Sequence, residues 1–245
     1  MKMGWYLRCQ EGDIAERVVL VGDPGRVATF VARLDDARTV NAERGLLTVT
    51  GRYDGVAVTI AAFGMGAPIM AVVLEEVAFL GARVVLRAGT AMAVADVALG
   101  DFIVPDGAVR GEHTSATYVP PEYPAVADRA LAGRATARVQ ALGHHAHGGL
   151  MASYDGFYSE MFSYTENGLA PHTAGLLARL EEWGVAATDM ETSALLAIGR
   201  YRKLRCASLC ALTVEARSQR ALRGVERIRV EEALVGASLE TVIAE

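Results

Sequence analysis

Two short segments of this chain place an arginine beside glycines next to an apolar run, a pattern that suits anion binding. In the first, the run Val18–Val21 stops at Gly22-Asp23-Pro24-Gly25, and Arg26 follows. Backbone N–H groups at a glycine turn and at a helix start attract negative charge, and Arg26 would add a fixed cation. Gly, Asp and Pro also build ordinary tight turns, so this segment alone leaves both interpretations open.

The second segment is Leu86-Arg87-Ala88-Gly89-Thr90, in which a charged side chain interrupts apolar residues. A buried arginine is costly without an anionic partner, and ligands of open α/β sheets bind beyond the carboxyl ends of the strands. We therefore expect Arg87 to lie at a strand end and to face an anion, with Gly89 and Thr90 as further donors. The alternative partner is one of the 29 acidic residues of the chain. Two such segments together favour a shared oxyanion site.

A third candidate is Asp189-Met190-Glu191 at the start of a predicted helix. Carboxylates are stabilised at helix starts, which is a sufficient structural reason for both acids. The functional interpretation is a carboxylate that accepts hydrogen bonds from a polyol, with Met190 in apolar contact. The local sequence does not decide between the two.

Two weaker patterns do not support a dinucleotide site or a metal site. Gly64-Met65-Gly66 begins like a dinucleotide fingerprint, but Ile69 occupies the third glycine position. His144, His145 and His147 lie in a polar connection without a carboxylate or thiolate at ligand spacing. We therefore expect a solvated loop there and no metal site.

The elements that must position these residues alternate along the chain. Apolar runs predict strands at 18–21, 45–50, 56–62, 84–88, 102–104, 149–152 and 205–213. Helical spacing predicts helices at 26–34, 67–80, 127–142, 173–183, 190–201 and 226–245, and the polar stretch 107–125 predicts a long, partly irregular loop. This alternation predicts a single α/β domain over residues 1–245, with a twisted, mixed but mostly parallel central sheet flanked by helices.

Composition narrows the class of protein. The chain has 245 residues, of which 52% are hydrophobic, and residues 55–74 carry no charge over a bilayer-spanning length. Gly64 and Pro68 would interrupt a helix there, so we expect a strand, a turn and a helix, and no membrane span. Lys and Arg number 24 against 29 Asp and Glu, giving a net charge of −5 without a basic tract, which argues against nucleic acid as a partner.

The cysteines and the N-terminal residues indicate a compartment. Cys9, Cys206 and Cys210 are too few for a disulfide framework, and the charged start of the chain lacks an apolar signal core. Both features predict a cytoplasmic protein. Cys206 and Cys210 have the same parity on a buried strand, so we expect them to be small apolar core residues.

The order and spacing of these segments resemble the nucleoside phosphorylase family of the trimeric-or-hexameric type. The resemblance covers nearly the whole chain. It rests on Gly12-Asp13, Gly22–Arg26, Arg44-Gly45, Gly64-Met65-Gly66, Arg87–Thr90, Phe157-Tyr158 and Met190-Glu191. It implies a phosphorolysis of the N-glycosidic bond, with inorganic phosphate as co-substrate and no metal or organic cofactor.

The resemblance also implies roles for single residues. The phosphate site would consist of Gly22, Arg26, Arg87 and Thr90, with Arg44 reaching into the site of a neighbouring subunit. Glu191 would bind the ribose hydroxyls, Met190 would contact the sugar, and Phe157 would lie near ribose and base. Arg87 and Glu191 thereby become the expected catalytic residues. Tyr6 occupies the position of a family histidine that reaches the adjacent ribose, so we expect a homo-oligomer, a dimer-based hexamer, with shared sites.

The base end of the site departs from the family pattern. Val214 replaces the acid of purine-specific members, while residues 121–128 resemble the uridine phosphorylase branch. In that branch a Gln and an Arg read uracil at the positions of Met161 and Ser163, and Ala91-Met92 replaces a Thr-Gly pair. We expect uridine or another pyrimidine nucleoside as substrate. The alternatives are a purine nucleoside phosphorylase, a phosphate-independent nucleosidase and a non-catalytic nucleoside-binding protein.

Overall fold

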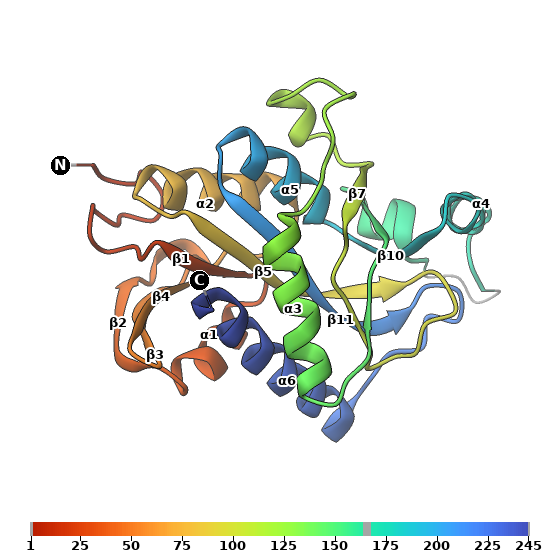
Figure 1. The fold of residues 1–245 in the computed structure, drawn as a ribbon. Coiled ribbons are helices and arrows are strands. Elements are labelled where there is room, and N and C mark those ends of the chain that lie inside the picture. The colour runs from red at the N-terminus through yellow and green to blue at the C-terminus, as the bar shows by residue number, and fades with distance from the viewer. Residues whose placement is uncertain (1, 164–167, 245) are drawn as a thin grey trace.

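The centre of the fold is one mixed sheet of eleven strands in a computed structural model that describes residues 2–163 and 168–244 (Figure 1). Its main path is β2-β3-β4-β1-β5-β10-β9-β7. Four strands run parallel in the middle, namely β1 (Arg17–Val21), β4 (Val56–Ala62), β5 (Val84–Ala93) and β11 (Arg205–Glu215). The prediction of an α/β fold with a mostly parallel central sheet is confirmed.

The outer strands complete the sheet on both sides. On the β4 side, β3 (Thr48–Tyr53) and β2 (Asp35–Asn41) continue antiparallel. On the other side, β10 (Val185–Asp189) pairs antiparallel with the end of β5, and β9 (Leu150–Ser153) and β7 (Gly107–Arg110) follow in parallel. The short strands β6 (Phe102–Ile103) and β8 (Ala146–His147) extend the sheet from β11.

Strand β5 is longer than its apolar run predicts. Its first residues pair with β1 up to Ala88, and its last pair with β10 at Met92 and Ala93, while β11 follows it from Val84 to Ala93. The prediction that Arg87 lies at a strand end is therefore wrong. The small residues after Ala88 remain extended because β11 pairs with them, and β1 is the strand that ends beside Arg87.

Helices cover both faces of the sheet (Figure 1). On one face, α1 (Pro24–Val31), α3 (Arg129–Ala141) and α6 (Gly224–Ile243) pack over a core that includes Phe30 and Leu131. On the other face, α2 (Ala67–Phe79) and α5 (Thr192–Tyr201) pack over a second core that includes Phe63 and Met70. Helix α4 (Pro171–Glu182) lies beside β10 and the short π-helix Phe157–Met161.

Several predicted bounds change in the structure. The stretch 107–125 starts with strand β7 and contains the 3-10 turn Ser115–Thr117, so it is less irregular than expected. A 3-10 turn, Glu43–Gly45, occupies the start of the strand that was expected at 45–50. Strands β2, β8 and β10 are not among the predicted strands, and β2 is a mostly polar segment. The C-terminal helix was expected to reach Glu245, which lies outside the described residues.

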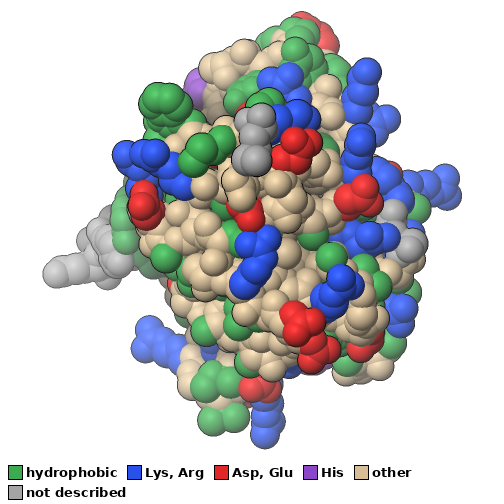
Figure 2. Space-filling view, turned by 90° about the vertical axis from the view of Figure 1, so that its left-hand side faces the viewer, with side chains coloured by type: hydrophobic (Ala, Val, Ile, Leu, Met, Phe, Trp, Pro, Cys, Tyr) green, Lys and Arg blue, Asp and Glu red, His purple; other side chains and the backbone are tan. Residues whose placement is uncertain are grey.

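The uncharged stretch 55–74 folds as predicted, as strand β4, a glycine turn and the first part of α2. In the described parts of the chain, no helix combines the length and apolar character that crossing a membrane requires. Figure 2 views the side of the molecule on which the N-terminal segment and strands β2 to β4 lie in Figure 1. Basic, acidic and hydrophobic side chains are interspersed on this face, and the basic ones do not gather into one continuous patch.

Candidate active site

A cavity of about 540 Å³ opens beside the middle of β5, within the size range of small-molecule sites. The residues that line it come from the β1–α1 turn, α1, the β4–α2 turn, β5, the π-helix 157–161, β10 and the β10–α5 junction, β11 and α6. They are Gly22, Asp23, Pro24, Arg26, Gly64, Met65, Arg87, Gly89, Thr90, Ala91, Met92, Phe157, Met161, Thr188, Asp189, Met190, Glu191, Thr213, Val214 and Arg227. The structure thus brings together the three segments that the sequence analysis singled out.

The sheet leaves a gap at this cavity. Strand β1 ends opposite Ala88, and β10 starts to pair with β5 only at Met92. Among the described strands, residues 89–91 therefore have a neighbour on the β11 side alone. Gly89, Thr90 and Ala91 line the cavity at this point, where main-chain groups of an extended strand can meet a ligand.

The turn after β1 forms one wall of the cavity. The Asp23 side chain caps α1 by accepting a hydrogen bond from the Gly25 amide at 2.8 Å. Because Gly22 has no side chain, the turn after β1 packs closely against the turn after β4. A Cβ at Gly22 would lie 3.0 Å from the carbonyl oxygen of Gly64. Arg26 follows in the first turn of α1, and its contacts with Ala88 O (3.5 Å) and Glu231 Oε1 (3.4 Å) are long. The side chain is buried, but its guanidinium has only these two weak contacts among the described residues.

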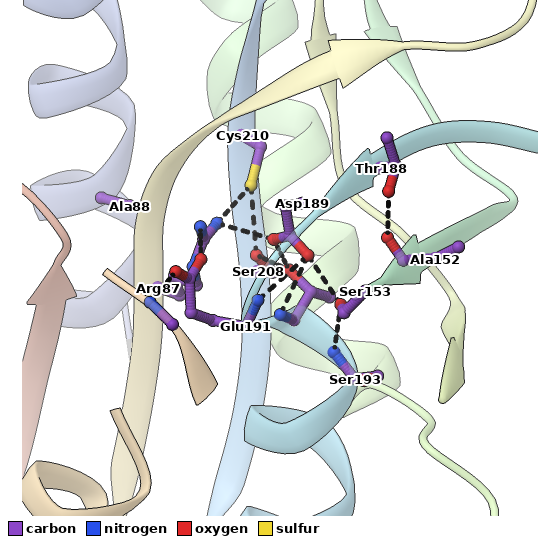
Figure 3. Close-up of polar contacts among 12 residues, drawn as sticks. Arg87, Ala88, Ala152, Ser153, Thr188, Asp189, Glu191, Ser193, Ser208 and Cys210 are labelled. Atoms are coloured by element: carbon purple, nitrogen blue, oxygen red, sulfur yellow. Dashed lines mark hydrogen bonds and ion pairs between the residues drawn. The ribbon is translucent and has the colours of Figure 1, made fainter. Parts of the chain in front are cut away.

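Arg87 is held far more tightly than Arg26, between two buried carboxylates (Figure 3). Its Nη1 lies 3.1 Å from Asp189 Oδ2, and its Nη2 donates to Glu191 Oε2. Nη1 also donates to the sulfur of Cys210 at 2.7 Å. The expectation that Cys210 is only an apolar core residue is wrong, because β5 and β11 are neighbours and place this thiol against the guanidinium.

Burial and neighbouring charges shift the pKa values of this cluster in opposite directions. Burial raises the pKa of the Glu191 carboxyl, Arg87 lowers it, and the neighbouring Asp189 charge raises it again, so that its pKa lies above the ordinary value. Burial likewise raises the pKa of the Cys210 thiol, which is therefore neutral at pH 7. For Arg87, burial lowers the pKa, but Cys210 and the two carboxylates raise it above its ordinary value. Arg87 is a permanent cation.

The opposite end of the cavity is apolar. Met92, Met161, Phe157, Met190 and Val214 belong to one hydrophobic cluster. Phe157 also stacks on the neighbouring Phe162 ring, with 5.3 Å between centroids. The cluster provides a flat, polarizable surface of the kind that holds a planar ring by stacking and sulfur contacts.

Two of the predicted residues lie elsewhere. Tyr6 and Arg44 do not line the cavity, although they contact each other, with Arg44 Cζ 5.4 Å from the centre of the Tyr6 ring. Both are exposed on the surface of this chain. All the other predicted site residues line the cavity: Gly22, Arg26, Arg87, Thr90, Ala91, Phe157, Met161, Met190, Glu191 and Val214.

Sequence reasoning assigned no role to several lining residues. Arg227 on α6 forms an ion pair with Glu231 at 2.9 Å, four residues later, and Glu231 also contacts Arg26. The i, i+4 spacing predicts this helical pair, but no local pattern shows that α6 passes the cavity. The hydroxyl of Thr188 donates to the Ala152 carbonyl oxygen at 2.8 Å (Figure 3). It also contacts the Met161 sulfur.

The described residues contain no group of three or more His, Cys, Asp or Glu side chains that could hold a metal ion. His147, one of the three clustered histidines, instead contacts Asp101 at 2.8 Å. His144 lies edge-on to Phe102. The cavity itself offers arginines and carboxylates, which suit an anion and a polyol.

Comparison with known proteins gives a consistent result. A family model described as "Phosphorylase superfamily" matches residues 16–236. The chain is 34% identical over 245 residues to a protein named uridine phosphorylase from Thermococcus kodakarensis, covering 99% of this chain and 87% of that protein. It is 33% identical over 208 residues to a guanosine phosphorylase from Halorubrum lacusprofundi, covering 84% and 81%. It is also similar to the crystal structure of uridine phosphorylase from Vibrio fischeri ES114, with a TM-score of 0.88 at 29% identity, covering 100% and 99%.

Proposed function

The chain belongs to the phosphorylase superfamily, and from this membership we propose that it cleaves the N-glycosidic bond of a nucleoside with inorganic phosphate, with uridine as the leading substrate. The products are the free base and ribose or deoxyribose 1-phosphate. One observation carries the proposal. Arginines that suit phosphate and a carboxylate that suits a sugar diol line the same cavity, and its far end is apolar.

In the proposed reaction, a phosphate oxygen attacks the anomeric carbon while the bond from that carbon to the base nitrogen breaks. The electron pair of the broken bond leaves with the base nitrogen, which gains a proton to give the free base as the hydrogen phosphate loses one, directly or through water. Arg26 and Arg87 orient the phosphate, and Gly22 and Thr90 add donors, so that an encounter becomes a positioned attack. The phosphate charge stabilises the positive charge that develops on the sugar.

The ribose lies between the anion and the base in this scheme. Glu191 accepts hydrogen bonds from the 2′- and 3′-hydroxyls, which are charge-assisted when the carboxylate is ionised. Met190 packs against the sugar. Arg87 and Glu191 are therefore the proposed catalytic residues, because both contact the groups that react or carry charge in the transition state.

Phe157, Met161, Ala91 and Val214 are the proposed contacts for the base. Uridine leads because most of the named relatives in the comparison are uridine phosphorylases, at 28 to 34% identity. No described side chain at this end matches the Gln and Arg with which the uridine phosphorylase branch reads uracil. Stacking and shape would then hold the base.

A purine nucleoside is the second candidate. It is favoured by the apolar base end and by the guanosine phosphorylase relative, which is nearly as similar as the first uridine phosphorylase. A pocket that hydrogen-bonds the edge of a base rejects the wrong base strongly, whereas a hydrophobic pocket discriminates only weakly. An apolar base end is therefore compatible with a purine as well as with uracil.

The proposal extends to the assembly. Residues 1–245 form one domain, and copies of the chain associate as a dimer-based hexamer in the cytoplasm. In that assembly Arg44 contacts phosphate and Tyr6 contacts ribose in the site of a neighbouring subunit. Their exposure on the surface of a single chain, outside its own cavity, supports this role. The reaction needs phosphate as co-substrate and no metal or organic cofactor.

A panel of uridine, thymidine, inosine, guanosine and adenosine, assayed for free base with and without phosphate, tests the proposal. We expect phosphate-dependent release, fastest from uridine. Faster release from inosine would select the purine alternative, and release without phosphate would identify a nucleosidase. Binding of nucleosides without any turnover would identify a binding protein and refute the enzyme.

A further inference from the structure

Asp189 lies beside Arg87 and accepts hydrogen bonds from several donors (Figure 3). Its Oδ1 accepts from the Ser153 hydroxyl at 2.6 Å and from the amides of Glu191 and Thr192 at 3.3 and 3.2 Å. Its Oδ2 accepts from the Thr192 hydroxyl at 2.5 Å and lies 3.1 Å from Arg87 Nη1. A buried carboxylate with this many donors is fixed in position.

Glu191 has far fewer partners, although it is equally buried. Its Oε1 accepts from the Gly66 amide at 2.7 Å, and its Oε2 accepts from Arg87. Glu191, Asp189 and Arg87 all line the cavity. One of its two oxygens is thus bound only through the guanidinium that phosphate would contact.

The two carboxylates share a single guanidinium in this buried cluster. A second anion at Arg87 would compete with them for its donors, and the partner with fewer other bonds leaves at lower cost. That partner is Glu191, whose freed oxygen is then available to hydroxyl groups. Asp189 keeps its other four donors and therefore keeps Arg87 in place.

We propose that Asp189 is a positioning residue that holds Arg87 in the phosphate site throughout turnover, while Glu191 is the exchangeable partner that phosphate releases to the ribose. This inference rests on the proposed function. It assigns different tasks to two carboxylates that lie two residues apart. It also couples the two substrates, because phosphate at Arg87 makes Glu191 available.

The test uses Asp189→Asn, which keeps the size of the side chain and removes its charge. Titration with inorganic phosphate alone should show about ten- to hundred-fold weaker binding, the loss expected when a charge-assisted contact no longer orients its partner. In turnover, the KM for phosphate should rise more than the KM for the nucleoside. Equal phosphate affinity in a folded Asp189→Asn protein would overturn the inference.

Two neighbouring serines supply a matched pair of variants. The Ser153 hydroxyl donates to Asp189, whereas the Ser193 hydroxyl donates to Glu112 at 3.0 Å. Both serines are fully buried. Ser153→Ala should weaken phosphate binding several-fold, and Ser193→Ala should leave it unchanged.

The serine pair keeps the inference testable if Asp189→Asn fails to fold, since equal phosphate affinities in the two serine variants would then overturn it. Phosphate titration needs no nucleoside. A chain that turns over no nucleoside would therefore refute the proposed function and still decide the role of Asp189.

Discussion

The phosphate site can be tested most cleanly at Arg26, because this arginine contributes little to folding. Its contacts with Ala88 O and Glu231 are 3.5 and 3.4 Å long, and Glu231 is partly exposed and also paired with Arg227. Although Arg26 is itself buried, both contacts are at the long end of the hydrogen-bond range, so Arg26→Ala should lower the free energy of unfolding by about 1 kcal/mol. Arg87→Ala, in contrast, would leave two buried carboxylates unpaired, at a cost of about 3–5 kcal/mol.

The expected loss of phosphate binding is larger than the loss of stability. One charge-assisted hydrogen bond contributes about 1.5–3 kcal/mol, so kcat/KM for phosphate should fall about ten- to hundred-fold at saturating nucleoside. Steady-state assays over a range of phosphate concentrations would measure it, beside urea unfolding of the same proteins. Arg38→Ala is the control, because Arg38 pairs with Asp13 at 2.9 Å and does not line the cavity. A folded Arg26→Ala enzyme with an unchanged phosphate dependence would refute the assignment.

Three further predictions concern pH, stability and base preference. Burial raises the pKa of Glu191, and only the ionised carboxylate accepts hydrogen bonds from both ribose hydroxyls. On acidification, kcat/KM for the nucleoside should therefore fall at a pH above the ordinary glutamate pKa of about 4.3. A fall that begins only below that pH would contradict this prediction. Asp128 caps α3 and pairs with Arg205, and these contacts lower the pKa of Asp128 against the effect of burial. Asp128→Ala should therefore lower the free energy of unfolding by about 1 kcal/mol near pH 7. The difference should shrink as the pH falls through the folded-state pKa of Asp128, which unfolding measured over a range of acidic pH would show. Met161→Gln should raise the preference for uridine over inosine about tenfold by offering amide groups to the uracil edge, and Met161→Leu should not.

The segments that form the site could be identified from sequence, but the contacts among them could not. Gly22–Arg26, Arg87–Thr90 and Met190-Glu191 each carry a local pattern, and the sheet brings all three to one cavity. The relation of Arg87 to its acidic partners depends on β10 lying antiparallel beside β5, which no spacing in the chain reveals. The sequence analysis offered two explanations for a buried Arg87, an acidic partner within the chain or a bound anion. In the structure Arg87 has acidic partners and also faces a cavity, so both explanations apply.

Other features escaped prediction for distinct physical reasons. Strand β2 is mostly exposed and polar, and it is extended only because β3 pairs with it at the sheet edge. Cys210 looks like an ordinary small core residue in sequence, and only the β5–β11 register places its sulfur beside Arg87. The contacts of Arg44 and Tyr6 with another subunit stay a prediction, since a single chain contains half of such an interface.

The gap beside residues 89–91 lets the main chain contact the ligand at one end of the site, whereas side chains form the other end. Main-chain groups at the gap are the same whatever the side chains are, whereas Met92 on the same strand and Val214 on β11 face the base end. Single substitutions there can redirect the choice of base without disturbing the anchor for the anion. Relatives named for uridine and for guanosine, at 34% and 33% identity to this chain, fit a scaffold whose specificity drifts while its chemistry is retained.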